Sequence, residues 1–501
     1  MGMETLDDEQ RYAAIAARDP RFDGEFFTCV RTTGIFCRPS CPARTPGRVS
    51  VTFVPSAAAA VAAGYRACKR CGPLAPPRGA DADPGGDLAA RALDLIAAGA
   101  LDAELGTDAP APHVADLAAL LHVSERSLHR ALLEHTGASA VAHARMARAR
   151  RAHELLRGTD RPLGEIAAAA GFGSERQLHD TVRAIYGVAP STLRPRSGRP
   201  LADTGTATAE LRVDLAVRRP FDGAGLAAWF AARAVPGVES VEGLRWSRAV
   251  RLPHGPAVLG VDLGVAEGPL PLTLRLADLR DYRAAVALVR RLLDLDADPR
   301  GIDAGLTAAV PALAGLVAAR PGVRIPGTTS VAEALLWAVV GQQVTVVQTR
   351  EQIIRATDLL AEPLPEPLSG GGSTRLPVDP ARAADRAEEW FRGPAARRRT
   401  LAAALGTDVD AEAPLAELEA QLLAIPGVGP WTAHYALLRG RRAIDQAPPR
   451  DAALLNAARD LGIAEDHAAL QRALADASPW RSYAALHLWH HAATPTRKDT
   501  P

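Results

Sequence analysis

Residues 422–433 read LLAIPGVGPWTA, and this segment decides the fold of the last third of the chain. One helical run ends in Pro-Gly-Val-Gly, and a second run begins at once with Pro430. Glycines at positions 427 and 429 let backbone N–H groups come close to a phosphate at a helix N-terminus, where the helix dipole also favours an anion. The segment therefore predicts a helix-hairpin-helix in which Gly427 and Gly429 contact a DNA backbone. A plain corner between two helices is the alternative.

A carboxylate and a group of aromatic residues follow the hairpin. Asp451 stands where a loop turns into a helix; it could serve only as a helix cap, and Asp445 is a nearby competitor. Aromatic residues make up only 4% of the chain, yet five of them lie in this short region. They are Trp431, Tyr435, Trp480, Tyr483 and Trp489. Core packing explains any single ring, but a cluster beside a phosphate grip and a carboxylate is what an extruded base requires.

All five cysteines lie near the N-terminus. Cys37 and Cys41 form C-x3-C, and Cys68 and Cys71 form C-x2-C. Two close pairs let four thiolates converge on one tetrahedral ion, and sulfur ligands favour zinc. Disulfides are the weaker alternative in a chain that we expect to be cytoplasmic. Cys29 has no spacing partner and is predicted to be a small buried apolar residue.

Two segments in the first half repeat one design, in which a short helix, a tight turn and a second helix follow one another. The first copy pairs residues 114–121 with a helix that begins at Ser124, and the second pairs residues 163–170 with one that begins at Ser174. A capping box between Ser174 and Gln177 is expected to define the start of that helix. The repeat predicts a tandem helix-turn-helix that binds DNA, with an ordinary helical bundle as the alternative.

A chain of 501 residues is too long for one hydrophobic core, so we expect a multidomain and mainly α protein. The expected domains are a small α+β zinc domain at 1–78, a tandem helix-turn-helix at 86–196, a small antiparallel sheet domain at 208–282 and an all-α helix-hairpin-helix domain at 283–495. Alternating or apolar runs predict the strands Glu210–Arg219, Val241–Leu252, Ala257–Gly264 and Leu270–Leu276. Linkers are predicted at 73–86 and 196–208, and a flexible surface loop around residues 369–373.

Charge and hydropathy exclude several classes. The net charge of +1 exerts no global pull on nucleic acid, so DNA binding must depend on local patches. No apolar stretch is long enough to span a membrane, and the N-terminus lacks the pattern of a secretory signal, so we expect a cytoplasmic protein without a membrane partner and a monomer. Nearly all basic residues are arginines, with Lys69 and Lys498 as the lysines.

These motifs resemble known families in pieces that cover nearly the whole chain. Residues 30–41 (VRTTGIFCRPSC) and 64–71 (GYRACKRC) resemble the N-terminal zinc domain of the Ada family. Residues 88–193 resemble an AraC-type tandem helix-turn-helix, and residues 208–493 resemble the AlkA family of 3-methyladenine DNA glycosylases with its N-terminal sheet domain. The resemblance implies alkylation repair: excision of alkylated purines from double-stranded DNA, with a zinc-thiolate sensor and a regulator half that binds promoter sites and RNA polymerase.

The zinc-domain resemblance assigns a role to each cysteine of the two pairs. Cys37 matches the cysteine that both binds zinc and accepts a methyl group from a DNA methyl phosphotriester, and Cys41, Cys68 and Cys71 match the remaining zinc ligands. A methylguanine methyltransferase domain is not expected, because no cysteine follows Cys71. The candidate DNA contacts of the helix-turn-helix pair are Ser124, Arg126, Arg130, Ser174, Arg176 and Gln177.

The glycosylase resemblance assigns Asp451 as the catalytic aspartate and Trp431, Tyr435 and Trp489 as the aromatic residues of the base cleft. A glycosylase that also cuts the strand carries a lysine shortly after the Gly-x-Gly turn, where this chain has Trp431. The enzyme is therefore expected to be monofunctional.

A loop of the glycosylase family that enters the duplex matches Gln342 and Gln343. The family usually has a bulky apolar residue where Gln343 stands and a tyrosine where Ala452 stands, which puts base preference and flipping efficiency in doubt. Two alternatives remain: a transcription regulator whose glycosylase-like body only binds DNA, and a structural zinc protein without methyl transfer. A pure DNA binder gains nothing from a carboxylate such as Asp451 beside phosphates, which favours the enzyme.

Overall fold

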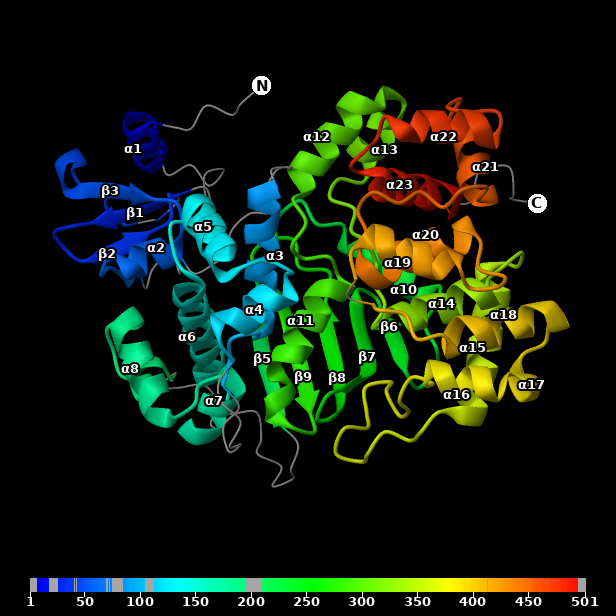
Figure 1. Ribbon diagram of the computed structural model, residues 1–501, viewed down its shortest axis with the longest axis horizontal. Coiled ribbons are helices and arrows are strands. Elements are labelled where there is room, and N and C mark those ends of the chain that lie inside the picture. The colour runs from blue at the N-terminus through cyan, green and yellow to red at the C-terminus, as the bar shows by residue number, and fades with distance from the viewer. Residues whose placement is uncertain are drawn as a thin grey trace. The chain divides into compact units, whose positions relative to one another are not determined.

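The computed structural model describes residues 7–17, 26–39, 41, 43–68, 71, 73, 84–103, 112–159, 161–194, 209–411 and 413–493. The chain divides into two compact units (Figure 1). The first unit comprises residues 1–205, 209–213 and 278–284, and the second comprises 206–208, 214–277 and 285–501.

The first unit begins with a small α+β module. Its elements are α1 (Asp8–Ala17), β1 (Phe27–Val30), β2 (Ile35–Cys37), β3 (Val51–Val54), α2 (Ala57–Ala62) and β4 (Arg66–Ala67), with a 3-10 turn η2 at Arg48–Ser50. The four strands form one sheet in the order β3-β1-β2-β4, in which β2 and β4 are parallel and the other pairs antiparallel. Ser56 caps α2 by accepting a hydrogen bond from Ala59 N. The module matches the expected α+β zinc domain, to which the structure adds helix α1.

The rest of the first unit is helical. It contains α3 (Pro84–Ala98), α4 (Val114–Leu120), α5 (Glu125–Thr136), α6 (Ala140–Gly158), α7 (Leu163–Ala170), α8 (Glu175–Tyr186) and α9 (Pro190–Leu193). The pairs α4–α5 and α7–α8 are the two predicted helix-turn-helices. Gly171 ends α7 at φ +87°, a conformation that glycine adopts without strain. Ser174 caps α8 as expected, but the Gln177 side chain accepts from Gly173 N and not from Ser174 N, so the capping box is incomplete.

A buried carboxylate holds the helix-turn-helix bundle together. The Asp102 side chain is 2% exposed and pairs with Arg151 at 2.5 Å, with Arg283 and with Arg148 at 3.8 Å. Arg151 also donates to the carbonyl of Ala170 at the end of α7, and burial lowers its pKa to about 10. The arginine-rich segment between the two helix-turn-helices therefore turns part of its charge inward, where it joins α6 to its neighbours.

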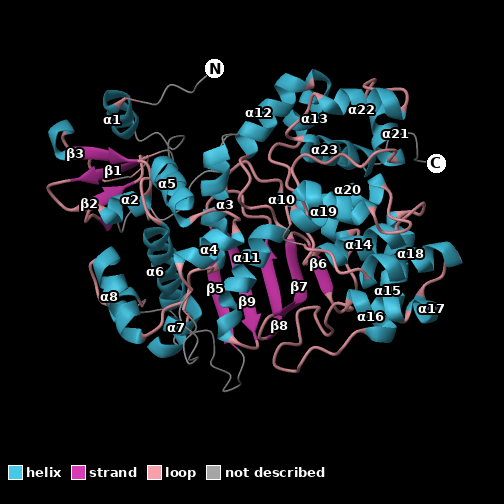
Figure 2. Ribbon diagram, viewed as in Figure 1, coloured by secondary structure: helices cyan, strands magenta, loops and turns pink. Residues whose placement is uncertain are grey.

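The larger of the two sheets, both drawn in magenta in Figure 2, has five strands; they belong to the second unit except for residues 209–213 of the first strand. Its strands are β5 (Ala209–Leu215), β6 (Glu239–Glu242), β7 (Arg245–Leu252), β8 (Gly255–Asp262) and β9 (Leu270–Leu276), with α10 (Gly223–Ala231) between β5 and β6. The order is β5-β9-β8-β7-β6, and the pairs from β6 to β9 are antiparallel. The predicted strand Val241–Leu252 is wrong as one element, because a turn at Gly243 (φ +62°) splits it into the hairpin β6–β7.

The remaining elements are helices. They are α11 (Tyr282–Leu292), α12 (Pro299–Ala309), α13 (Ala314–Ala319), α14 (Val331–Val340), α15 (Val346–Leu360), α16 (Pro380–Asp385), α17 (Ala387–Trp390), α18 (Ala395–Gly406), α19 (Leu415–Leu423), α20 (Pro430–Arg441), α21 (Ala452–Asp460), α22 (His467–Ala475) and α23 (Arg481–Ala493). Those from α14 to α20 share one apolar core. Helix α14 is buried along most of its length and packs against α18 and α20. Among the described residues no helix combines the length and the apolar composition needed to cross a lipid bilayer.

Two loop predictions need correction. The segment around residues 369–373 is not a free flexible loop: Leu364, Leu368 and Leu376 are buried against the sheet, and Arg275 donates to the carbonyls of residues 369 and 370. The glycine-rich composition of this segment predicts flexibility, but in the structure these glycines form a tight turn between buried leucines. The predicted linker at 73–86 ends early because α3 begins at Pro84, and residues 74–83 and the predicted linker 196–208 lie outside the described part of the chain.

The Asp102 cluster yields a stability prediction. Asp102→Ala should leave Arg151 buried without its counter-charge, which costs about 3–5 kcal/mol when one partner of a buried pair is removed. Hydrogen–deuterium exchange of the full chain should show the loss as faster exchange in α6 and α7. Arg176→Ala is the control because its side chain is 93% exposed, and its effect should stay within about 0.5 kcal/mol. Equal protection of α6 in Asp102→Ala and wild type would contradict the structural role.

Candidate functional site

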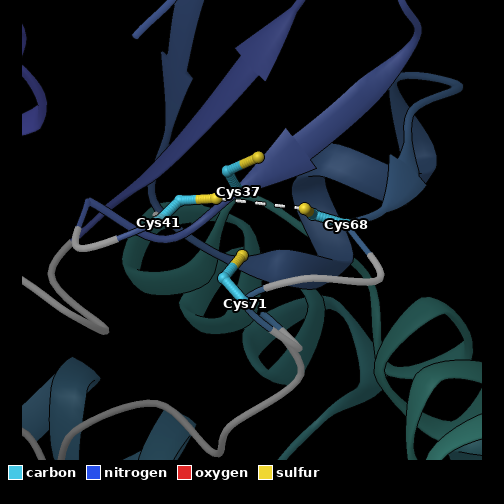
Figure 3. A group of neighbouring side chains, drawn as sticks. All are labelled: Cys37, Cys41, Cys68 and Cys71. Carbon is cyan, nitrogen blue, oxygen red and sulfur yellow. Dashed lines mark hydrogen bonds between the residues drawn. The ribbon is translucent and has the colours of Figure 1, made fainter. Parts of the chain in front are cut away.

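The four predicted zinc ligands come together in the structure (Figure 3). Cys37 ends β2, and Cys68 directly follows β4, so the pairing of these two strands brings one cysteine of each pair close to the other. The four Sγ atoms all lie within 4.8 Å of one another, and those of Cys41 and Cys68 are 3.9 Å apart. Cys29 is fully buried in β1, as predicted, and burial raises its pKa to about 12.

The electrostatics of the cysteine cluster fit a bound cation. The pKa of Cys37 is raised by its hydrogen bond with Cys71 and by burial, and burial raises that of Cys41 to about 11. Four thiols this close cannot all ionise without a central positive charge, which a divalent metal supplies. An all-sulfur tetrahedral donor set selects Zn²⁺, so the cluster is a zinc site.

The cysteines differ in how open they are. Cys41 and Cys68 are buried, whereas Cys37 and Cys71 are partly exposed. Cys71 Sγ accepts a hydrogen bond from Arg38 N at 3.5 Å, and its pKa is lowered to about 6, first by the hydrogen bond from Cys37. A thiolate that accepts such bonds is a weaker nucleophile. Cys37 and Cys71 are thus the two partly exposed sulfurs of the cluster, and Cys71 has one lone pair engaged by the Arg38 N–H group.

The six predicted DNA contacts of the helix-turn-helix pair are exposed at the starts of α5 and α8. They are Ser124, Arg126, Arg130, Ser174, Arg176 and Gln177. Ser124 and Ser174 accept hydrogen bonds from the backbone three residues later and so cap their helices. Arg176 is paired only loosely with Asp180, at 3.8 Å. Both helix-turn-helices thus present basic and polar side chains to solvent in the same way, on the second helix of each pair.

The predicted hairpin is present, with α19 and α20 joined by the turn that contains Gly427. Gly427 adopts φ +86°, and a Cβ atom there would lie 1.9 Å from Thr400 Oγ1, so the turn requires glycine for both reasons. Gly429 is the N-cap of α20, and Pro430 occupies the first turn of this helix. The first backbone N–H groups of α20 are thus directed at the position where a phosphate would lie.

The two glutamines of the turn between α14 and α15 play different parts. Gln342 Nε2 donates to Gly427 O at 3.2 Å and to Thr432 Oγ1 at 3.1 Å, which ties this turn to the hairpin. Gln343 is exposed at φ +58°, an uncommon conformation for a residue other than glycine. Gln343 therefore lies exposed at the tip of this turn, and the amide of Gln342 holds the turn against the hairpin formed by α19 and α20.

The Asp451 carboxylate is held from three sides. Its Oδ1 accepts from Leu454 N at 2.9 Å, which makes Asp451 the N-cap of α21. Its Oδ2 accepts from Trp431 Nε1 at 2.8 Å, and Oδ1 also accepts from Trp489 Nε1 at 3.3 Å. Asp451 therefore caps α21 and is also bound by two indole N–H groups of the aromatic cluster.

The aromatic cluster is real but differs in membership from the prediction. Trp431 and Tyr435 stack with ring centroids 5.4 Å apart, and Trp489 lies edge-on to Tyr435 at 6.4 Å. The structure adds Trp229 of α10, whose centroid is 5.7 Å from that of Trp489. Trp229 lies about 200 residues earlier in the chain than the other rings. The one sequence signal for it is that tryptophan is rare in this chain, with seven in all.

Two of the five predicted rings stand apart from this cluster. Tyr483 is buried and donates to Asp294 Oδ2 at 2.8 Å, and Trp480 packs against Tyr483 at 6.2 Å. Trp480 and Tyr483 lie just before and in the first turn of α23, whereas Trp489 lies further along the same helix and contacts the cluster.

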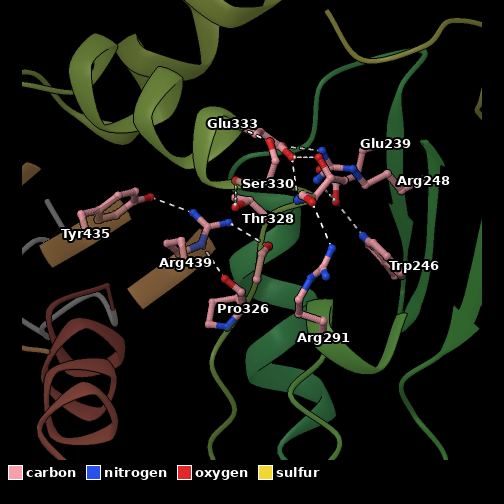
Figure 4. Close-up of polar contacts among 12 residues, drawn as sticks. Glu239, Trp246, Arg248, Arg291, Pro326, Thr328, Ser330, Glu333, Tyr435 and Arg439 are labelled. Carbon is pink, nitrogen blue, oxygen red and sulfur yellow. Dashed lines mark hydrogen bonds and ion pairs between the residues drawn. The ribbon is translucent and has the colours of Figure 1, made fainter. Parts of the chain in front are cut away.

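Two arginines contact the aromatic cluster, and Figure 4 shows one of them, Arg439, beside Tyr435. The Tyr435 hydroxyl accepts from Arg439 at 2.7 Å, and Arg439 also donates to the Pro326 carbonyl. The Arg233 guanidinium lies 3.7 Å from the centroid of Trp229, and burial lowers its pKa to about 10. Burial alone raises the pKa of Tyr435, but Arg439 and Arg233 outweigh it and lower that pKa. Arg439 and Arg233 thus hold the Tyr435 and Trp229 side chains in one arrangement.

A buried ion cluster anchors α14 to the sheet. Arg248 of β7 pairs with Glu333 of α14 and, at 3.8 Å, with Glu239 of β6. Glu239 also accepts from Trp246 Nε1 at 2.6 Å. Because α14 leads into the turn with Gln342 and Gln343, the sheet fixes where that turn lies.

Asp445, the competitor of Asp451, is fully engaged elsewhere. It forms a two-pronged ion pair with Arg481 at 2.7 and 2.8 Å and accepts from Ser478 Oγ at 2.9 Å. Burial raises its pKa, but the bonds from Arg481 and Ser478 together outweigh this and lower it. A carboxylate whose charge is already compensated has little left to offer a developing cation, which favours Asp451.

Family models match three stretches of the chain. The metal binding domain of Ada matches residues 10–73, a helix-turn-helix domain matches residues 117–196, and the AlkA N-terminal domain matches residues 212–330. The last match extends beyond residue 282, the end that we predict for the sheet domain.

Relatives support the same assignment. A Mycobacterium tuberculosis protein named probable bifunctional transcriptional activator/DNA repair enzyme AlkA is 38% identical over 501 residues, which cover 99% of this chain and 98% of the relative. The Escherichia coli bifunctional transcriptional activator/DNA repair enzyme Ada is 59% identical over 68 residues, 14% of this chain and 19% of the relative. The Escherichia coli DNA-3-methyladenine glycosylase 2 is 31% identical over 283 residues, 54% of this chain and 94% of the relative.

The cysteine geometry predicts that the purified chain holds one zinc ion. Cys68→Ala combined with Cys71→Ala should abolish zinc retention, because two thiolates do not complete the coordination sphere and the small module depends on its metal. Elemental analysis after gel filtration measures this. Cys29→Ala should retain the zinc, since that cysteine lies outside the cluster. Wild-type protein without zinc, or full retention by the double variant, would refute the site.

Proposed function

The chain belongs to the family of bifunctional transcriptional activator/DNA repair enzymes, and we propose that it excises alkylated purines such as 3-methyladenine from double-stranded DNA with Asp451 as the catalytic residue. The observation that carries this proposal is the Asp451 carboxylate held by two indole N–H groups, one of them from the Trp431 ring that stacks on Tyr435. The hairpin around Gly427 supplies the grip on the backbone that an enzyme acting on an extruded base requires.

The chemistry asks little of the protein beyond electrostatics. An alkylated purine carries a positive charge, so when its bond to C1′ breaks, the base takes the electron pair and leaves neutral. The sugar then carries the positive charge, and the ionised Asp451 stabilises it. Water adds to C1′ and releases one proton to solvent, which completes hydrolysis to an abasic site.

The surrounding side chains prepare this charge interaction before the substrate arrives. Trp431 and Trp489 fix the direction of the carboxylate through their N–H groups and are only partly buried, so their rings are open to a base. A carboxylate that is already oriented when the bond breaks stabilises the transition state far more than one that must reorient in water. The turn between α14 and α15 is proposed to enter the DNA duplex. It carries Gln342 and Gln343, and Gln343 lies at its tip.

For the zinc half we propose methyl transfer to Cys37. The Cys37 sulfur attacks the methyl carbon of a methyl phosphotriester, the O–CH₃ bond breaks, and the phosphate oxygen keeps the electron pair and becomes anionic again. Bound zinc keeps the four thiols deprotonated at neutral pH. Forming the thioether removes one negative charge near DNA, a change worth on the order of 1–4 kcal/mol before screening. Methylation would thereby tighten DNA binding by the regulator half.

The regulator half is proposed to place α5 and α8 on promoter DNA through the six exposed residues at their starts. RNA polymerase is the further partner that a transcriptional activator needs, and we propose that the chain acts as a monomer in this role.

The excision mechanism predicts different outcomes for two neighbouring carboxylates. Asp451→Asn should cut single-turnover release of 3-methyladenine by about 10²–10³-fold, the usual effect of removing one preorganised charge. The asparagine oxygen still caps α21, so folding and binding to undamaged duplex should be kept. Asp445→Asn is the matched control and should excise at nearly the wild-type rate. Loss of activity in Asp445→Asn alone would move the catalytic role to that residue.

Wild-type product should consist of intact strands with abasic sites that break only under alkali or heat. The reason is that Trp431 occupies the position after the hairpin turn, so no amine is placed there to form a Schiff base with the sugar. Borohydride trapping of a protein–DNA adduct would contradict monofunctional chemistry.

Methyl transfer predicts that Cys37 alone becomes labelled when the protein is incubated with duplex carrying methyl phosphotriesters. Cys71 is equally open but has a less nucleophilic sulfur, and Cys41 and Cys68 are buried. Peptide mass mapping locates the added methyl group. A label on any other cysteine, or none at all, would exclude this part of the proposal.

A further inference from the structure

Three consecutive arginines lie at the start of α18, and we call Arg397, Arg398 and Arg399 the arginine patch. Arg397 and Arg398 are half-buried, and Arg399 is exposed. Within the described part of the chain, the side chains of these three residues form no hydrogen bond and no ion pair. The start of α18 therefore carries a concentrated positive charge that the described residues do not neutralise.

The arginine patch occupies an unfavourable place in its own helix. The N-terminus of a helix carries a partial positive charge, so acidic side chains stabilise it and basic side chains destabilise it. The first turn of α18 contains no acidic residue, and its N-cap, Pro394, accepts no hydrogen bond with its side chain. Adjacent like charges also repel one another. A sequence that works against its own helix in this way is expected where the side chains serve a ligand.

The carboxylates nearest in sequence do not compensate the patch. Glu389 of α17 forms an ion pair with Arg386, and Glu388 beside it is exposed. Asp408 follows the opposite end of α18, which has 12 residues and is therefore about 18 Å long. Burial lowers the pKa of Arg397, and no carboxylate offsets this effect. The charge of the patch is thus available to an anion from outside the protein.

Helix α18 packs directly against the hairpin formed by α19 and α20. A Cβ atom at Gly427 would lie 1.9 Å from Thr400 Oγ1, so Thr400 contacts the hairpin turn. Arg397 lies three residues before Thr400 and therefore on the same side of the helix. The Gln352 side chain of α15 accepts from Arg392 N at 2.9 Å and donates to Arg392 O at 3.0 Å, which holds the segment before α18. The patch is thus fixed beside the hairpin.

We propose that the arginine patch binds the backbone phosphates of duplex DNA next to the phosphate that the hairpin contacts. The inference rests on the proposed excision function and adds a charged contact to the uncharged one of the hairpin. Duplex DNA fits because it carries about one negative charge per 1.7 Å of its axis. The net charge of +1 gives the chain no overall attraction to DNA, so a local patch has to supply it.

The test measures single-turnover release of 3-methyladenine from a short methylated duplex at several protein and salt concentrations. Excision counts only those complexes in which the glycosylase region holds the DNA. The main variant combines Arg398→Gln with Arg399→Gln, and a second variant replaces both residues by lysine. Arg300→Gln is the matched control, because Arg300 is also an exposed arginine in the first turn of a helix, α12. Thermal unfolding of each variant is measured alongside.

The glutamine pair should raise the half-saturating protein concentration by at least about tenfold at low salt. The slope of log affinity against log salt should become shallower by about 1–2, since each lost phosphate contact removes about 0.9. The rate at saturation should change much less, because a phosphate contact is the same before and during bond breaking. Thermal unfolding should not move to lower temperature, because the lost charges oppose the helix dipole.

The two other variants separate charge from shape and from position. The lysine pair should behave nearly as wild type, because a phosphate contact requires a positive charge and not the planar fork of a guanidinium. Arg300→Gln should keep the wild-type half-saturating concentration and salt slope, since it removes the same charge outside the patch.

Several results would overturn the inference. One is a glutamine pair with the wild-type half-saturating concentration and salt slope, and another is a lysine pair as weak as the glutamine pair. An equal loss in Arg300→Gln would show a general effect of charge and would also overturn it. If the glutamine pair unfolds, Arg399→Gln alone decides, because that side chain is exposed.

Failure of the excision proposal is distinguishable from failure of the patch. If wild type releases no methylated base, the excision proposal fails. The patch is then decided by binding of the same variants to a duplex with a neutral tetrahydrofuran abasic analogue. An unchanged salt slope in the glutamine pair on that duplex would overturn the patch as well.

Discussion

The helix-hairpin-helix half depends on one carboxylate that accepts hydrogen bonds from three helices. Asp451 takes Leu454 N from α21, Trp431 Nε1 from α20 and Trp489 Nε1 from α23. An anion at this position is affordable only because each bond compensates part of its charge before DNA arrives. The same bonds orient two indole rings of the aromatic cluster, so the carboxylate and the aromatic side chains are arranged by a single constraint.

Much of this site could be predicted from the sequence because its members share local signals. Pro-Gly-Val-Gly announces the hairpin, and Asp451 follows two prolines at a helix start, as a cap does. What local reasoning could not supply is the approach of segments distant in the chain. Trp229 of α10 packs against Trp489 of the aromatic cluster. Trp480 and Tyr483 lie outside this cluster, because Tyr483 is buried against Asp294 and Trp480 packs on Tyr483. Tertiary packing decides which face of a helix contacts which partner.

The zinc module and the helix-turn-helix pair illustrate the same division. Cysteine spacing predicted the ligands, and strand pairing between β2 and β4 explains how they meet. By contrast, the ion pairs around Asp102 had no signal in the sequence, and the packed loop with Leu368 contradicts the flexible glycine tract that composition suggests. In both places long-range burial overrides the local preference. Gln342 is a further example of a long-range contact, because its side-chain amide donates a hydrogen bond to the hairpin at Gly427.

The central claim is that Asp451 is set in advance to stabilise a positive charge on the sugar. Its most direct test compares binding of two uncleavable abasic analogues in otherwise identical duplexes, one a cationic pyrrolidine and the other a neutral tetrahydrofuran. Wild type should bind the cationic analogue at least about tenfold more tightly, because it resembles the transition state, and Asp451→Asn should lose this preference while keeping its affinity for the neutral one. Equal binding of both analogues by wild type, or an undiminished preference in Asp451→Asn, would contradict the account.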